Sequence, residues 1–188
     1  SYGGFVHTDD LNFKDAHDCV KLLKETAVSL ECDAIQITLN PIIYQKHLSN
    51  YLDFALIRHH FTYLKREISS VVELPKHEDT IISLYREEAK RAIRKAQKND
   101  VRIMETNQFE QYYAILSKNL KMRHGVSPTH SLDELLRLKE KFPDSIRLWG
   151  AFLDEKLIAG VCNFSANAKV VLAFYISHDE DYQEYRPV

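Results

Sequence analysis

One loop of the chain gathers the residue types best suited to chemistry. Residues 121–130 read KMRHGVSPTH and connect two predicted helices. His124 and His130 suit proton transfer because the unperturbed pKa of histidine lies near neutral pH. Arg123 and the hydroxyl groups of this loop place hydrogen-bond donors beside them. A polar helix connector with surface histidines is the alternative interpretation of the same residues.

A basic amphipathic helix is predicted over residues 85–101. An apolar stripe follows one face, and the rest of the cylinder carries six cations: Arg86, Lys90, Arg91, Arg94, Lys95 and Lys98. Such a face could attract an anionic ligand: nucleotide phosphates, a tRNA backbone or an acidic glycan. The alternative is a solvated surface on which Glu87 pairs with Arg91. We predict Arg94 and Lys95 as the anion contacts because they lie closest to the strand that follows.

The composition bounds the function classes. A formal net charge of -2 gives no overall attraction to nucleic acid or anionic membranes, so a basic site must be local. The 45% hydrophobic and 28% charged residues are ordinary for a globular protein with a buried core. No apolar run approaches the roughly 20 residues that span a bilayer, and the first residues do not resemble a signal peptide. We therefore expect a cytoplasmic protein.

Metal and nucleotide motifs are missing from the sequence. The 3 cysteines are far apart and odd in number, which favours free thiols over a disulfide framework. The 9 histidines match no familiar ligand spacing, so we predict no metal site. The sequence has no glycine-rich phosphate loop, no dinucleotide fingerprint and no nucleophile elbow, and its 5 glycines could not build one.

Periodicity in the first half predicts alternating strands and helices. Asn12, with Asp15 three residues later, begins a helix whose apolar positions continue to Leu30. Residues 5–7 and 34–39 are predicted strands on either side of it, the second one stopped by Asn40-Pro41. A further helix is predicted over residues 48–60 and a further strand over residues 68–74.

The second half changes from helical to strand periodicity. Asp79 or Thr80 is the predicted cap of the basic helix, and residues 101–105 form a short strand. Asn107 and Ser131 each precede a glutamate by three residues, which predicts two further helix starts. After Pro143 three strands alternate with turns: residues 146–153, 157–164 and 170–177.

A short polar segment led by Pro75 separates the two halves. We therefore predict two domains, residues 1–78 and residues 79–188. The chain begins without Met on Tyr-Gly-Gly-Phe and ends on Tyr-Arg-Pro-Val, so we expect an internal piece of a longer protein.

The order of several phrases resembles the FemAB-related, GNAT-like proteins of bacteria. In the first half these are Tyr2-Gly3-Gly4-Phe5, Asn40-Pro41 with Tyr44, Leu52-Asp53 and Val71-Val72-Glu73-Leu74. In the second half they are Arg91 to Ala96 with Val101, Arg123-His124-Gly125, Pro128, His130, Phe142-Pro143, Ala151 and Ala159-Gly160. The resemblance covers nearly the whole chain.

The resemblance implies an α/β (α+β) fold of the acyl-CoA N-acyltransferase type. It implies two partial lobes with mixed, largely antiparallel sheets: the back of the first lobe and the front of the second. The last strand would edge the acyl site, with Tyr175 and Asn163 as polar tips in an apolar trough. Ordinary strand packing is the alternative for both residues. The phosphate-cradling turn of the family would fall near Arg186.

Function follows from the same resemblance. We expect an acyltransferase that moves an acyl or aminoacyl group to an amine on a small molecule, or on a cell-envelope sugar or peptide. Acyl-CoA is the expected donor. Aminoacyl-tRNA is the alternative donor, which the absence of an evident helical arm disfavours. His124 or His130 would handle the proton, Tyr175 would donate a hydrogen bond, and Arg94, Lys95, Arg123 and Asn163 would contact substrate or cofactor. The rival hypothesis is a non-catalytic lobe that binds an anionic glycan or a protein partner.

Overall fold

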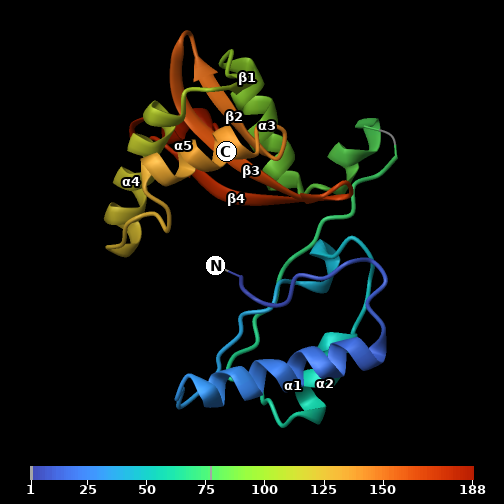
Figure 1. The fold of residues 1–188 in the computed structure, drawn as a ribbon. Helices are drawn as coiled ribbons and strands as arrows, with labels where there is room; N and C mark the ends of the chain where they lie inside the picture. Colours follow the sequence, from blue (N-terminus) through green and yellow to red (C-terminus); the bar gives the residue numbers. More distant parts are fainter. Residues whose placement is uncertain (1, 77) are drawn as a thin grey trace. The chain divides into compact units, whose positions relative to one another are not determined.

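The computed structural model describes residues 2–76 and 78–188 (Figure 1). The chain divides into two compact units, Ser1–Val71 and Val72–Val188. The division falls between residues 71 and 72, whereas the sequence predicts a boundary after residue 78. Residue 77, within the predicted boundary segment, lies outside the described residues.

The first unit is built on two helices. Helix α1 spans Phe13–Ser29 and begins as predicted, because the side chain of Asn12 accepts the backbone N–H of Asp15 at 3.0 Å. A short 3-10 helix, η1, spans Ile42–Tyr44, and α2 spans Tyr51–Arg58 inside the predicted range. The two α-helices bury a small cluster that contains Ala16, Val20, Ala55 and Leu56.

The three strands predicted for residues 5–7, 34–39 and 68–74 are wrong. No strand is assigned within residues 2–76. The N–H of Gly3 donates to the carbonyl of Thr38 at 2.8 Å, but the two extended segments do not form a ladder. Ile68 is fully exposed and Leu74 is 71% exposed, so alternating apolar residues in the third segment have no surface to cover. A strand is stabilised by its neighbours, and the sequence pattern alone does not supply them.

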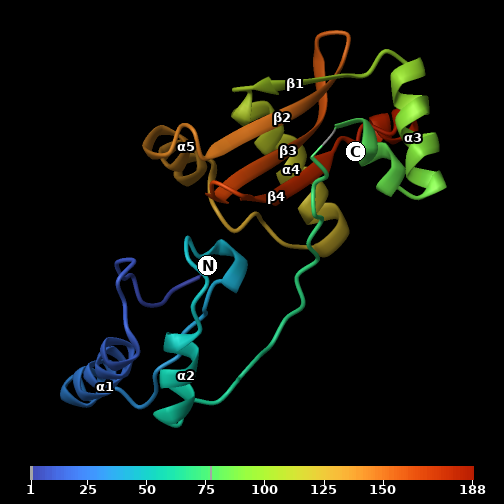
Figure 2. The same cartoon turned by 90° about the vertical axis from the view of Figure 1, so that its right-hand side faces the viewer.

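The second unit contains the predicted antiparallel meander. Its strands are β1 (Arg102–Thr106), β2 (Ile146–Leu153), β3 (Lys156–Asn167) and β4 (Val170–His178). They form one sheet in the order β1-β2-β3-β4, and every neighbouring pair is antiparallel (Figure 2). β1 and β4 are therefore the two edges of this sheet. The predicted strands of the meander are confirmed.

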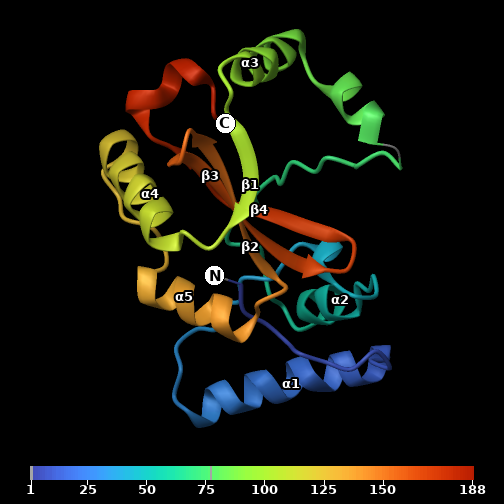
Figure 3. The same cartoon turned by 90° about the horizontal axis from the view of Figure 1, so that it is seen from above.

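Two helices cover one face of this sheet (Figure 3). Helix α4 spans Phe109–His124 and packs on β3 and β4, whereas α5 spans Leu132–Lys141 and contacts β2. Ser131 and Glu134 form the complete capping box predicted for α5. The box predicted from Asn107 is not formed, because α4 has Gln108 at its N-cap without a side-chain bond. The core between helices and sheet includes Phe109, Tyr112, Leu116, Leu135, Leu148 and Cys162.

The basic helix is shorter than predicted. A 3-10 helix, η2, spans Glu78–Leu84, and α3 spans Glu87–Lys98 with Arg86 at its N-cap. The predicted cap at residue 79 or 80 is therefore wrong, and the side chains of those two residues lie outside the described part. Glu87 pairs with Lys90 at 2.9 Å and not with Arg91, which pairs with Glu88 instead. A last 3-10 helix, η3, spans Glu180–Tyr185.

Candidate active site at the edge of the sheet

A β-bulge in β4 organises the candidate site. Cys162 of β3 pairs with Tyr175 and the next residue, Asn163, pairs with Ala173, so Phe174 is an extra residue in β4. Bulges break the strict alternation of side chains and often occur next to active sites. Here the ring of Phe174 stacks on Phe164 of β3 with centroids 4.6 Å apart and the planes inclined by 8°. The Tyr175 ring meets Phe174 edge-on at the same distance between centroids.

Hydrogen bonds hold His130 against this bulge. Its backbone N–H donates to the Tyr175 hydroxyl at 3.1 Å, and its ring nitrogen Nδ1 lies 2.9 Å from the same oxygen. On the other side of the residue, the Tyr113 hydroxyl donates to the His130 carbonyl at 3.0 Å. Two predicted site residues, separated by 45 positions in the sequence, are thus in direct contact.

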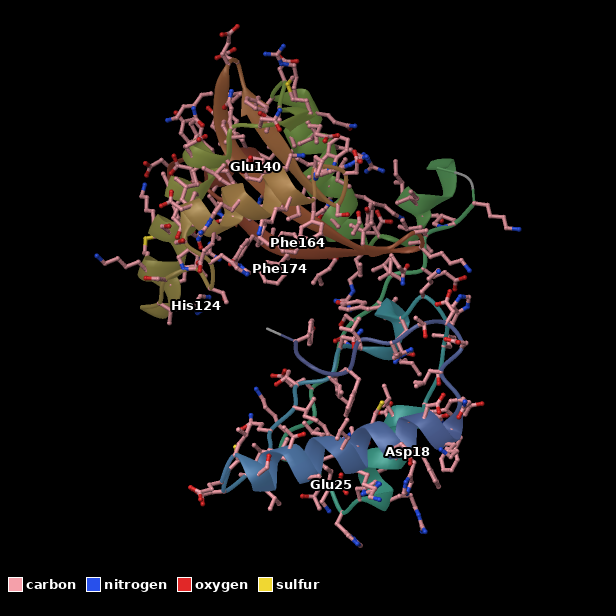
Figure 4. All side chains as sticks on the ribbon, viewed as in Figure 1. Asp18, Glu25, His124, Glu140, Phe164 and Phe174 are labelled. Atoms are coloured by element: carbon pink, nitrogen blue, oxygen red, sulfur yellow. The ribbon has the colours of Figure 1, made fainter. Side chains whose placement is uncertain are left out.

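Aromatic rings surround the His130 imidazole. Its ring centroid lies 5.5 Å from that of Phe174 and 6.4 Å from that of Phe164. Figure 4 shows Phe164 and Phe174 close to each other. Because Nδ1 is engaged by Tyr175, the second ring nitrogen, Nε2, is the atom that remains available. Within the described residues Nε2 has no hydrogen-bond partner. The arrangement therefore presents one free imidazole nitrogen beside an apolar wall at the sheet edge.

Charged groups near His130 are engaged elsewhere. The carboxylate of Glu134 accepts the backbone N–H and the hydroxyl of Ser131, and these bonds lower the pKa of Glu134.

Cys162 lies in the core next to the bulge, and burial raises the pKa of its thiol to about 12. A thiol with that pKa is protonated at neutral pH, so it is not a nucleophile. The imidazole of His130 is the side chain of this cluster whose ring nitrogen can offer a lone pair to a proton.

Arg123 and His124 are placed differently from His130. Arg123 donates from Nε to the Glu180 carboxylate at 2.8 Å, and Asn119 donates to the same oxygen at 3.2 Å. This network ties the end of α4 to η3. His124 is the exposed last residue of α4 (Figure 4) and makes no hydrogen bond or ion pair within the described part of the chain. The structure does not bring either side chain to the Tyr175 hydroxyl.

Asn163, Arg94 and Lys95 also lie apart from His130. Asn163 is half-buried on β3, between Cys162 and Phe164, and strand alternation directs its side chain to the opposite face of the sheet. Arg94 and Lys95 are exposed on α3, which leads into β1, the edge opposite to β4. Of the seven predicted site residues, the structure joins only His130 and Tyr175 by direct contact among the residues described.

Sequence reasoning missed Tyr113, Phe164 and Phe174. Tyr113 fits the apolar stripe of α4, so its hydroxyl carries no signal in the pattern. Phe164 and Phe174 look like ordinary strand residues, because the bulge that brings Phe174 and Tyr175 to the same cluster is a register shift. Two adjacent aromatic residues in a strand could have suggested such a bulge, but they would not have located it.

In the described residues no group of three or more His, Cys, Asp or Glu side chains could hold a metal ion. None of the helices in that part of the chain is both long and apolar enough to cross a bilayer.

Comparison with known families decides the fold family. Residues 83–188 match the acetyltransferase (GNAT) domain family, which is 106 of the 188 residues and thus more than half of the chain. The chain belongs to the GNAT acetyltransferase family. Its α/β class with an antiparallel four-stranded sheet is that of the acyl-CoA N-acyltransferase fold. Among curated proteins, none matches the chain.

Domains of the GNAT family typically bind acetyl-CoA. Among the described residues β4 pairs with β3 alone, so its outer side there offers backbone donors and acceptors near the bulge. An extended ligand arm that carries amide groups can bond to such an edge as an added strand does. Backbone groups of residues 172–176 would hold that arm beside the aromatic rings of Phe164 and Phe174.

Proposed function

We propose that this GNAT protein transfers an acyl group to an amine and that His130 accepts the amine proton. One observation carries the proposal: His130 is held by Tyr175 at the bulge of the edge strand, with Nε2 free. Membership of the family supports acyl transfer in general. The acyl thioester would supply the activated carbonyl, and the residues of this chain supply the proton acceptor and the position.

The tautomer of His130 determines what Nε2 can do. When Nδ1 carries the proton, it donates to the Tyr175 oxygen, which also accepts the His130 backbone N–H. Nε2 then presents its lone pair and can take a proton from an ammonium or from an attacking amine. The Tyr175 hydroxyl keeps its own proton in this arrangement and can donate it to another group. Within the pair His130 donates from Nδ1 to the Tyr175 oxygen, while toward the substrate Nε2 of His130 is the proton acceptor and the Tyr175 hydroxyl is a hydrogen-bond donor.

The acceptor amine is proposed to be part of a small molecule or of a cell-envelope sugar or peptide. The support is the resemblance to FemAB-related bacterial proteins, together with the aromatic rings of Phe164 and Phe174 beside the His130 ring. These rings suit the carbon skeleton next to an amine, and they disfavour a second charge close to the reacting nitrogen. The same resemblance supports the proposal that residues 1–78 belong to a first GNAT-like lobe and residues 79–188 to a second.

The test measures thiol release from acetyl-CoA with a panel of amines. His130→Gln is expected to lower kcat by about 10²–10⁴, the range typical of a lost general base. The binding constant of acetyl-CoA, measured by calorimetry, should stay unchanged. His124→Gln is the matched control, and it should retain near wild-type turnover because its side chain lies outside the Tyr175 cluster. Equal losses in both variants, or no turnover with any amine, would reject this assignment.

A binding function on α3 is the second candidate. The exposed side chains of Arg94 and Lys95 support it, because opposite charges on the same helix are engaged by Lys90 and Arg91. An anionic glycan or an acidic partner would then bind with an affinity that falls as salt is added. The charge reversal Arg94→Glu with Lys95→Glu should abolish binding of heparin as a test polyanion. An unchanged affinity for heparin would remove both residues from any anion site.

A further inference from the structure

Two adjacent tyrosines of α4 have opposite surroundings. Tyr112 is fully buried over Gly160, and its hydroxyl has no partner within the described residues. Tyr113 is half-buried, and its hydroxyl donates to the His130 carbonyl at 3.0 Å, across 17 residues of sequence. The second tyrosine therefore holds a specific peptide group of the loop that carries the proposed proton acceptor.

The peptide group next to His130 lies in a chain of hydrogen bonds. Its carbonyl accepts from Tyr113, and the N–H of the same peptide, on Ser131, donates to the Glu134 carboxylate at 2.8 Å. Bonds arranged in series polarise one another through the shared amide. The Glu134 end is fixed by the capping box of α5, and the Tyr113 end is fixed by α4. Hydrogen bonds from α4 and α5 therefore hold this peptide group in place.

A hydrogen bond to the sheet holds the preceding peptide group. The N–H of His130 donates to the Tyr175 hydroxyl, and Nδ1 contacts the same oxygen. Both backbone groups of His130 are therefore engaged by tyrosine hydroxyls, one from α4 and one from β4. The loop before it offers less support, because residues 125–127 and 129 are exposed and Gly125 has a left-handed φ of 67°.

We propose that Tyr113 is a positioning residue for acyl transfer. It fixes the backbone of His130 so that Nδ1 stays on the Tyr175 hydroxyl and Nε2 faces the acceptor amine. This inference rests on the proposed role of His130. Tyr113 touches neither donor nor acceptor, so its effect is on kcat and on the imidazole itself, whereas the binding of acetyl-CoA is independent of it.

Tyr113→Phe tests the inference because it removes one hydroxyl and keeps the ring. The matched control is Tyr182→Phe, whose hydroxyl accepts a bond from Lys156 at 2.9 Å and whose ring packs on a separate buried cluster. In Tyr113→Phe, kcat should fall by about ten- to a hundredfold, as expected for a displaced catalytic group. The KM for acetyl-CoA should be unchanged. Turnover in Tyr182→Phe should equal that of the wild type.

A spectroscopic measurement separates positioning from general loss of structure. The imidazole of His130 is followed by NMR through a pH titration in wild type and in both variants. A shifted titration midpoint or several His130 resonances in Tyr113→Phe alone supports the inference, and an unchanged His130 signal with unchanged kcat overturns it. Equal kcat losses in Tyr113→Phe and Tyr182→Phe also overturn it. If wild type shows no turnover, the proposed function fails, and an altered His130 signal in Tyr113→Phe still establishes that Tyr113 positions the ring.

Discussion

The two units of the chain contain similar sequence patterns, but only the second unit forms a β-sheet among the described residues. Both have amphipathic helices with a side-chain cap, at Asn12 and at Ser131. Both also have alternating apolar segments predicted as strands. Only in residues 72–188 do those segments pair into a sheet, which buries a core against α4 and α5. In the first unit the buried cluster between α1 and α2 has four members.

The difference shows that helices form from local sequence signals, whereas strands form only where a neighbouring strand is available. A helix satisfies its backbone hydrogen bonds locally, so α1 and α2 form from residues close in sequence. A strand satisfies them only through neighbours. Residues 146–178 contain three consecutive strands joined by short turns, and each strand supplies the partner of the next. The extended segments of the first unit are separated by helices and lack such neighbours in the described residues.

The largest expected effect compares the two cores by the same substitution. Leu135→Ala in the second unit and Leu56→Ala in the first both remove a buried leucine, with exposures of 0% and 6%. Leucine-to-alanine changes cost about 2–5 kcal/mol, depending on how far the site collapses. We expect Leu135→Ala near the upper end because sheet and helices surround it, and Leu56→Ala near the lower end.

Each unit has its own reporter for that comparison. Chemical denaturation followed by fluorescence of Trp149, the single tryptophan, reports on the second unit. Amide hydrogen exchange of α1 reports on the first. An equal or larger cost for Leu56→Ala would show that the smaller cluster is packed as rigidly as the larger one.

A second prediction compares two glycines. A Cβ at Gly160 would lie 2.8 Å from the Tyr112 ring, which is fully buried and cannot yield, whereas a Cβ at Gly3 meets nothing within 4 Å. Gly160→Ala should therefore destabilise the second unit by about 1–3 kcal/mol through overpacking. Gly3→Ala should change the stability of the first unit by less than about 0.5 kcal/mol. The same two reporters measure both, and a tolerated Gly160→Ala would contradict the close contact of α4 with β3.

The sequence predicts the elements of the second unit well because their signals are local. The capping box of Ser131 and Glu134 lies within four residues, and β2 and β3 are joined by a turn at residues 154–155, inside the gap between the strands predicted for residues 146–153 and 157–164. Asn107 has the same signal but is not the cap, because α4 starts after Gln108, whose N–H donates to the Thr106 hydroxyl at 3.2 Å. Local side-chain bonds of this kind are not visible in spacing alone.

The candidate site could be predicted only in part. His130 and Tyr175 are identifiable by residue type, but their contact depends on a bulge that shifts the register of β4 by one residue. Tyr113 belongs to the candidate site because its hydroxyl donates to the His130 carbonyl, although its position in α4 predicts only a packing role. Arg123 has the chemistry of an anion ligand, yet Glu180 engages it from η3. Long-range pairing decides all three cases, and a single sequence contains no direct record of it.

A smaller effect concerns pH and the first unit. Nε2 of His59 lies 3.3 Å from Nδ1 of His17, which joins α2 to α1. Burial, followed by the neighbouring His17 and Lys24, lowers the pKa of His59 below its usual value of 6.5. Since the folded state disfavours the protonated ring, this contribution to stability is present above about pH 6.5 and is lost as the pH falls through the lower folded-state pKa.

Hydrogen exchange measures this pH dependence. The protection of α1 amides, corrected for intrinsic exchange at each pH, should fall below about pH 6.5. His59→Gln removes the titrating group, so its protection should show a weaker slope over the same range. An identical slope in wild type and His59→Gln would assign the pH dependence to other groups of the first unit.

The smallest expected effect compares one tyrosine from each unit. Tyr112 is buried in the second unit with an unpartnered hydroxyl, whose pKa burial raises, so it remains a protonated donor without an acceptor among the described residues. Tyr44 in the first unit is half-buried, and its ring meets the Tyr2 ring edge-on with centroids 5.9 Å apart. Removing an unsatisfied buried hydroxyl is neutral or stabilising, and Tyr44→Phe keeps the ring contact. Tyr112→Phe should leave the Trp149 transition unchanged or raise its midpoint, and Tyr44→Phe should change the stability of the first unit by less than about 0.5 kcal/mol, measured by protection in α1. A clear loss of stability in Tyr112→Phe would mean that its hydroxyl has a buried partner, such as an ordered water molecule between α4 and the sheet.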